Sequence, residues 1–244
     1  MTTKATEAEI IRAAASFSYF LFNHTYIRDV QPDGSARVIQ FEQWPIHEEQ
    51  LRDLAKYKRL IDLKARQVSW SWLRGSYAAW NMLFKGHYQV GVGSAGELEA
   101  TEFIDKVRFV LERLPYDPLP TIFPNNALLL GVPGESTIMG FPSTAKAARG
   151  FNYNLFIADE AAFHPWAQEA YASYEAATEH GQIIIGSSAG DEARQVTNDF
   201  FQRMFMGAPD TGFHASFYPW TVRPGRDAAW FEERRRRMSS KPGQ

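Results

Sequence analysis

Two adjacent acids at the end of a short apolar run are the residues best placed to do chemistry. Leu155, Phe156, Ile157 and Ala158 read as a buried strand of a parallel sheet, and Asp159 and Glu160 follow. Ligands of open α/β folds bind at this carboxyl edge of the sheet. Asp159 could hold Mg²⁺, directly or through water, and Glu160 could orient and deprotonate an attacking water. The alternative is a strand whose exit is solvated by two acids.

A basic loop before a helix is the second candidate. A short strand is expected over 59–63 and a helix from Trp72 to about Phe84, so backbone N–H groups of the loop could face a phosphate. The standard Gly-Lys-Ser/Thr signature is absent, because Trp70 stands where the lysine would be and the loop has no glycine. A solvated turn is the alternative. The loop residues are Lys64, Ala65, Arg66, Gln67, Val68, Ser69, Trp70 and Ser71.

Three weaker signals have an ordinary interpretation beside the functional one. Gln50, upstream of the loop, could hydrogen-bond adenine as in many motor ATPases, or it is a surface glutamine. Ser187 and Ser188 follow an apolar strand over 182–186 and could sense a γ-phosphate, or they are a plain strand exit. The arginines at 234–237 suggest a DNA patch, but pairing of Glu232 and Glu233 with Arg236 and Arg237 favours a salt-bridged surface helix.

Composition limits the classes of protein that the chain can be. The 244 residues are 45% hydrophobic and 22% charged, which predicts one large domain or one with a small appendage. The absence of cysteine excludes disulfides, thiolate metal sites and a cysteine nucleophile. The net charge of −2 means that nucleic-acid contact would need a local basic patch. No signal peptide or membrane-spanning run is expected.

Helices and strands are expected to alternate, which predicts a parallel α/β sheet. A helix over 6–22 and two strands around the turn at 32–35 form an N-terminal appendage. Pro133 and Gly134 predict a hairpin between 127–132 and 136–141. A short helix is expected to begin near Ser143. The other expected helices begin at Pro45 and span 96–114, 161–179, 193–206 and 226–238, and the other strands span 88–94 and 213–218.

Four segments in one order carry a resemblance to a known family. They are Gln50, the loop from Lys64 to Trp72, the Asp-Glu-Ala-Ala-Phe run that begins at Asp159, and the Ser-Ser-Ala-Gly run that begins at Ser187. Together they resemble the ATPase domain of the large terminase subunit of tailed bacteriophages, the motor that packages DNA into the procapsid. The resemblance covers about residues 40 to 240 and implies an α/β P-loop NTPase of the RecA-like, ASCE type.

The resemblance implies a role for each charged residue of the two main segments. Many terminases have a deviant Walker A motif whose lysine begins the loop, which corresponds to Lys64; Arg66 is the second candidate. Ser71 matches the hydroxyl that ligates Mg²⁺. Asp159 matches the Walker B carboxylate and Glu160 the catalytic glutamate. The residues from Lys64 to Trp72, with Gln50, would then bind ATP.

Three other positions are assigned by the resemblance. Ser187, Ser188 and Ala189 match the coupling motif that links hydrolysis to motion. Arg149 lies where terminases have an arginine finger, which in a ring would act on the neighbour's ATP. Ser69 departs from the family, which usually has glycine there; serine resists positive φ by roughly 1–2 kcal/mol, so a different loop shape or weaker ATP binding is expected.

The resemblance also implies domain limits and partners. Residues 1–42 would be the appendage, 43–225 the ATPase core, and 226–244 a helix and a linker toward a nuclease domain that this sequence lacks. No nuclease activity is therefore expected. The resemblance further implies that the protein contacts double-stranded DNA without regard to sequence and forms a homo-oligomeric ring on the portal. It also implies the small terminase subunit as a partner. The expected location is the host cytoplasm, and no contact with a membrane is expected. The alternatives are a helicase-like P-loop ATPase, a nucleotide-binding assembly module without turnover, and a non-catalytic interaction domain.

Overall fold

The computed structural model describes residues 3–30, 35–144, 148, 150–189 and 199–239. Within these residues, seven strands form a sheet of order β5-β6-β4-β7-β8-β3-β9 in which only β5 is antiparallel to its neighbour. The predicted mainly parallel α/β sheet is confirmed. The strands are β3 (Arg59–Lys64), β4 (Gln89–Ser94), β5 (Leu129–Val132), β6 (Ser136–Pro142), β7 (Leu155–Asp159), β8 (Gln182–Ser187) and β9 (His214–Tyr218).

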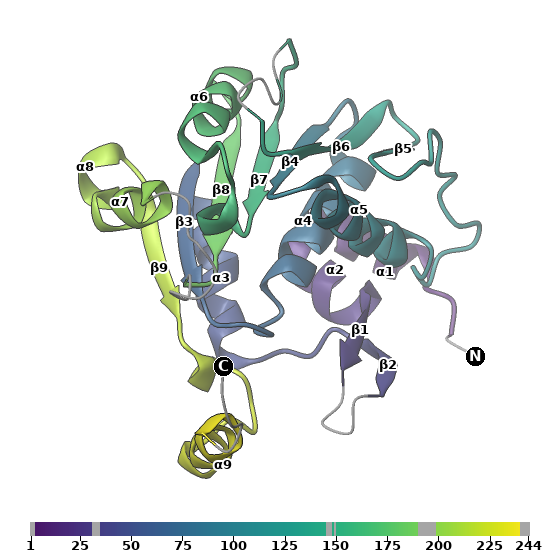
Figure 1. Ribbon diagram of the computed structural model, residues 1–244. Helices are drawn as coiled ribbons and strands as arrows, with labels where there is room; N and C mark the ends of the chain where they lie inside the picture. The colour runs from purple at the N-terminus through teal and green to yellow at the C-terminus, as the bar shows by residue number, and fades with distance from the viewer. Residues whose placement is uncertain (1–2, 31–34, 145–147, 149, 190–198, 240–244) are drawn as a thin grey trace.

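Helices cover both faces of this sheet (Figure 1). Helices α4 (Trp70–Lys85) and α5 (Glu97–Leu111) pack on one face, and α6 (Ala167–Ala177) and α7 (Phe200–Met206) belong to the core of the other. Side chains of β7 alternate between these cores: Leu155 and Ile157 enter the first, and Phe156 and Ala158 the second. Asp159 therefore continues the row that faces α4.

The N-terminal helix expected over 6–22 is instead two helices, α1 (Glu7–Ala15) and α2 (Phe17–His24). The chain leaves the helical region at Ser16, where φ is −143° and ψ is 112°. The Ser16 side chain then accepts a hydrogen bond from the backbone N–H of Tyr19 and so begins α2. The continuous apolar periodicity concealed this break.

The two strands expected near the N-terminus form a separate antiparallel hairpin of β1 (Tyr26–Val30) and β2 (Ala36–Gln40). Residues 32–34 of the expected turn lie outside the described residues. Helix α3 (Pro45–Lys56) follows and begins at Pro45 as expected. Pro133 and Gly134 join β5 to β6 in the predicted hairpin.

The helix expected over 161–179 is also interrupted. A short 3-10 helix, η1 (Ala161–Phe163), precedes α6, and Pro165 lies between them. Proline restricts the residue before it to extended backbone and removes a helical N–H donor, which explains the interruption. Of the helix expected over 193–206, α7 lies in the described part and 193–198 lie outside it. Residues 145–147 of the short helix expected after Ser143 also lie outside it.

The C-terminal part comprises α8 (Ala208–Thr211), β9, η2 (Trp220–Val222) and α9 (Ala228–Ser239). Helix α9 lies at the same end of the molecule as the β1–β2 hairpin (Figure 1). None of the described helices is long and apolar enough to cross a membrane.

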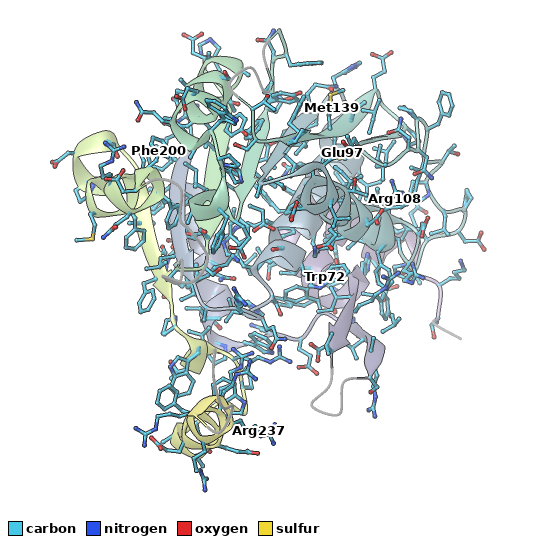
Figure 2. All side chains as sticks on the ribbon, in the orientation of Figure 1. Trp72, Glu97, Arg108, Met139, Phe200 and Arg237 are labelled. Atoms are coloured by element: carbon cyan, nitrogen blue, oxygen red, sulfur yellow. The ribbon has the colours of Figure 1, made fainter. Side chains whose placement is uncertain are left out.

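The arginines of α9 are mainly engaged within that helix, as the salt-bridge interpretation predicts. Arg237 pairs with Glu233 as expected, and its side chain is exposed on α9 (Figure 2). Glu232 pairs with Arg235 at 2.8 Å, one position earlier than expected, while Arg236 Nε donates to the backbone carbonyl of Glu232.

Candidate active site

Lys64 and the two acids converge at the carboxyl edge of the sheet. Lys64 ends β3 and Asp159 ends β7, with β8 between the two strands. Lys64 Nζ donates to Glu160 Oε1 at 2.7 Å and lies 4.0 Å from Asp159 Oδ1. The Lys64 side chain is only 6% exposed, so these attractions act where water screens them weakly. The structure thus brings a cation and two carboxylates together at this edge of the sheet.

Glu160 reaches this cluster because its backbone is left-handed. Its φ of 53° and ψ of 45° turn the chain at the end of β7, so that two successive acids approach Lys64 instead of pointing to opposite faces. A non-glycine residue in this region is strained, and such strain clusters at functional sites. The Oε2 atom of Glu160 accepts 2.9 Å hydrogen bonds from the backbone N–H and the hydroxyl of Ser188, and the Ser187 hydroxyl lies at 3.4 Å.

The environment shifts the pKa values of the two acids in opposite directions. Burial raises the pKa of Asp159, and the charge of Lys64 offsets only part of this effect. Burial would also raise the pKa of Glu160, but the Lys64 charge and the hydrogen bonds from Lys64 and Ser188 lower it overall. Glu160 is therefore held as a carboxylate, oriented by its partners on both oxygens.

Ser71 and Asp159 offer a fitting pair of ligands for Mg²⁺. The Ser71 hydroxyl donates to Asp159 Oδ2 at 2.7 Å, and Asp159 Oδ1 is buried with no hydrogen-bond partner among the described residues. No cluster of three or more acidic, histidine or cysteine side chains suitable for a metal occurs in the described part of the chain. A site with few protein oxygens suits Mg²⁺, which takes most of its ligands from water and phosphates.

A pocket of about 180 Å³ lies over the loop and reaches Glu160. Every residue from Lys64 to Trp72, the whole segment predicted to bind ATP, lines it. Trp72 lies in the first turn of α4 and is labelled in Figure 2. Lys106 of α5 also lines the pocket. Sequence reasoning missed Lys106, because a lone lysine within a helix carries no signal.

Trp70 belongs to the buried core, although it occupies the place of the standard lysine. Its side chain is 2% exposed, and its Nε1 donates to Asp62 Oδ2 at 2.6 Å. Arg74 donates to the same oxygen at 2.8 Å, and both Asp62 and Arg74 are fully buried. The preceding Ser69 has φ 59° and ψ 13°, so serine adopts here the left-handed conformation that favours glycine. The buried Trp70 contact stabilises the loop in this shape.

The other predicted site residues lie apart from this cluster or outside the described part. Gln50 on α3 is fully buried, does not line the pocket over the loop, and its amide has no hydrogen-bond partner among the described residues. Ala189 is exposed directly after Ser188. Arg149 lies outside the described residues.

Two arginines near the C-terminus contact the loop and were missed by sequence reasoning. They belong to the segment 219–227, named here the arginine strap. Arg223 donates to the Gln67 carbonyl at 3.0 Å and to Asp29 Oδ1 at 3.2 Å. Arg226 donates to the Arg66 carbonyl and to Gln67 Oε1, both at 2.9 Å. The Arg-Pro-Gly-Arg sequence at 223–226 was the only available signal, and it predicts a turn rather than a contact.

Comparison with known structures identifies the fold. The large terminase ATPase domain of Thermus phage P74-26 matches with a TM-score of 0.58 and 18% identity, over 83% of this chain and 90% of that one. The HK97 bacteriophage large terminase matches with a TM-score of 0.60 and 14% identity. The large terminase of a thermophilic bacteriophage, solved in complex with ADP, matches with a TM-score of 0.57 and 12% identity. The fold is that of a large terminase ATPase domain.

These comparisons confirm the resemblance and the RecA-like P-loop fold that it implied. The chain covers 46% of the HK97 large terminase and 46% of the large terminase solved with ADP, so it spans about half of each. The latter protein was also solved in complex with ATP-gamma-S. No protein-family model matches the sequence. A comparison with curated proteins also gives no match.

Proposed function

We propose that this chain is the ATP-hydrolysing motor domain of a viral DNA-packaging terminase. The observation that supports this function best is that Lys64, Ser71 and Glu160 line one pocket over the loop, and that Asp159 contacts Ser71 and lies 4.0 Å from Lys64 behind them. The terminase ATPase fold is the second support, and the ADP and ATP-gamma-S complexes of the thermophilic bacteriophage terminase agree with it.

The charges of the site suggest how each residue acts on ATP. Lys64 neutralises the β and γ phosphates and exchanges its Glu160 partner for phosphate oxygen when ATP enters. Glu160, still held by Ser188, then orients a water in line with the γ-phosphate and accepts its proton. Ser71 and Asp159 would hold Mg²⁺, which neutralises charge on the phosphates.

Coupling and partners complete the proposal. Ser187 and Ser188 contact Glu160, so loss of phosphate would be sensed at the end of β8 and passed through Ala189 to the DNA-gripping surface. Arg149 would act on the ATP of a neighbour in a homo-oligomeric ring on the portal. DNA contact would be mainly to phosphates, hence independent of sequence and sensitive to salt. Gln50 remains a prediction for adenine contact.

The deciding experiment is phosphate release from ATP by wild type, Lys64→Ala and Glu160→Ala. Both variants should lose turnover by about 10²-fold or more. Lys58→Ala is the matched control, because Lys58 is exposed and precedes the opposite end of β3. Turnover that survives both changes would rule out these roles. Nucleotide binding without phosphate release would instead favour an assembly module. Separation of DNA strands without DNA packaging would favour a helicase-like enzyme.

A further inference from the structure

A lysine on a second helix lines the pocket over the loop. Among the described residues, Glu160 and Lys106 of α5 are the ones that line this pocket from outside the segment 64–72. Glu160 has a role in the proposed function, whereas Lys106 has none. Lys106 is partly buried, so its place beside the pocket is set by the packing of α5.

The packing of α5 on α4 holds Lys106 beside the beginning of α4. The two helices lie side by side (Figure 1). The ring of Phe109, about one turn along α5 from Lys106, meets the Trp72 ring edge to face with centroids 5.5 Å apart. Gly75 of α4 permits a close approach, since a Cβ built there would lie 3.9 Å from the Cβ of Lys106. Gly75 follows Ser71 by about one helical turn.

The Lys106 ammonium is not neutralised by a carboxylate. Within the described part of the chain, its Nζ donates to the backbone carbonyl of Glu102 at 3.3 Å and forms no ion pair. Lys64, in contrast, is paired with Glu160 at 2.7 Å. The charge of Lys106 also acts at the acidic end of the site: burial raises the pKa of Asp159, and the charges of Lys64 and, more weakly, Lys106 oppose this rise. Lys106 is therefore a cation available to an anionic ligand.

We propose that Lys106 binds the terminal phosphates of the nucleotide and takes the role that the lysine at position 70 has in the standard loop. This inference rests on the proposed function, since it needs the phosphates to lie over the loop. Position 70 cannot supply that charge, because Trp70 is buried and donates to Asp62. A lysine is a point charge on a long, flexible stem, so a neighbouring helix can supply the same ammonium.

Arg66 is the competing cation, because it also lines the pocket. Arg66 is exposed, whereas Lys106 is partly buried. Water and salt screen an exposed charge strongly, so a phosphate gains more from Lys106 than from Arg66.

The test measures binding of ATP-gamma-S and of inorganic pyrophosphate by calorimetry in the presence of Mg²⁺. Lys106→Gln should weaken both about ten-fold, the effect of one hydrogen bond to a charged group. Glutamine forms helix about as well as lysine, so α5 is retained. Lys106→Arg keeps the charge and should bind both ligands to within about three-fold of wild type. Pyrophosphate has neither base nor ribose, so its weaker binding assigns the contact to phosphate.

Two controls separate a phosphate contact from damage to the fold. Lys58→Ala removes an exposed lysine that does not line the pocket, and it should change neither affinity. The urea midpoint of Lys106→Gln without nucleotide should equal that of wild type. A lower midpoint, with a loss of affinity that Lys106→Arg does not restore, would assign Lys106 a structural role and overturn the inference.

Unchanged affinities in Lys106→Gln also overturn the inference, as does a ten-fold loss in Arg66→Gln with none in Lys106→Gln. In these cases the proposed function stands as long as wild type releases phosphate from ATP and Lys64→Ala does not. If wild type binds neither ligand and releases no phosphate, the proposed function fails as well.

Discussion

The ion pair between Lys64 and Glu160 gives the nucleotide-free site a defined arrangement. At 2.7 Å the two charges neutralise each other, and Ser188 fixes the second carboxylate oxygen. A triphosphate offers Lys64 a partner of higher charge, so binding and repositioning of Glu160 are one event. Because phosphate and the Glu160 carboxylate compete for the Lys64 ammonium, removal of the carboxylate should affect turnover and nucleotide binding differently.

Glu160→Gln should reduce turnover by about 10²–10⁴-fold, because the amide cannot accept the proton of the attacking water. The same variant should bind ADP at least as tightly as wild type, since Lys64 no longer has a carboxylate partner at 2.7 Å. Phosphate release and calorimetry measure the two effects. A parallel loss of ADP affinity would contradict this arrangement and assign Glu160 a structural role.

Trp70→Phe should lower the free energy of unfolding by about 1.5–3 kcal/mol, the range for a hydrogen bond to a charged group. The change removes the 2.6 Å bond from Trp70 to the fully buried Asp62 and leaves Arg74 as its donor. Urea unfolding measures the loss. Trp72→Phe, at a partly exposed indole two residues on, should cost less. Equal losses of unfolding free energy in the two variants would show that the hydrogen bond from Trp70 to Asp62 adds no measurable stability.

Residue types and order predicted that Lys64 and the two acids would lie together, but not the contacts that support them. Lys64 and Glu160 were found because a cation before a helix and acids after an apolar run are local patterns. The pairing of Trp70 with Asp62 was not predictable, because an indole in a basic loop resembles an exposed side chain until the sheet beneath it is known. Arg223 was missed for the same reason, since its contact with Gln67 crosses 156 residues.

At the scale of elements, the alternation of helices and strands along the chain predicted the sheet and the hairpin within it. The predictions of one continuous helix over 6–22 and another over 161–179 were wrong, because each is interrupted. The apolar periodicity of 6–22 continues through Ser16, although the backbone is extended there and the Ser16 hydroxyl caps the second helix. Pro165 is a readable signal for the second interruption, because proline disfavours helical backbone at the residue before it. The order of strands was beyond sequence reasoning, because parallel neighbours such as β3 and β8 are joined by contacts far apart in the chain.

The packing of β8 against α4 allows almost no added volume. A Cβ atom at Gly186 would lie 2.2 Å from Cζ2 of the buried Trp70 ring, so Gly186→Ala should cost about 1–3 kcal/mol of unfolding free energy. Gly75→Ala on α4 is the matched control: its Cβ would lie 3.5 Å from Val107, an ordinary contact, and alanine favours helix by roughly 0.5–1 kcal/mol. In urea unfolding, the change in the free energy of unfolding should therefore have opposite signs in the two variants. If Gly186→Ala is as stable as wild type, β8 must shift readily to make room for the added methyl group.

At the scale of the whole molecule, two buried histidines make stability depend on pH. Burial lowers the pKa of His47 and that of His164 from 6.5 to about 4 in the folded chain. Between pH 6.5 and 4 the unfolded chain therefore binds more protons than the folded one, and the free energy of unfolding falls as pH falls. Each histidine should contribute a loss of about 3 kcal/mol as the pH approaches 4.

Denaturant unfolding at several pH values between 7 and 5 measures this slope before most carboxylates titrate. In His164→Gln the slope should be shallower, because one of the two sites is gone. An unfolding free energy that stays constant across this range would show that the histidines bind protons equally in the folded and unfolded states, which would contradict their lowered pKa.

The close fit of Trp70 over Gly186 has a consequence for the evolution of this chain. The Trp70 ring fills the space that a side chain at position 186 would need. The residues at positions 70 and 186 are therefore expected to vary together among relatives. Sequences that restore the usual lysine at the first position would be free to carry a larger residue at the second, and those that keep the indole would not.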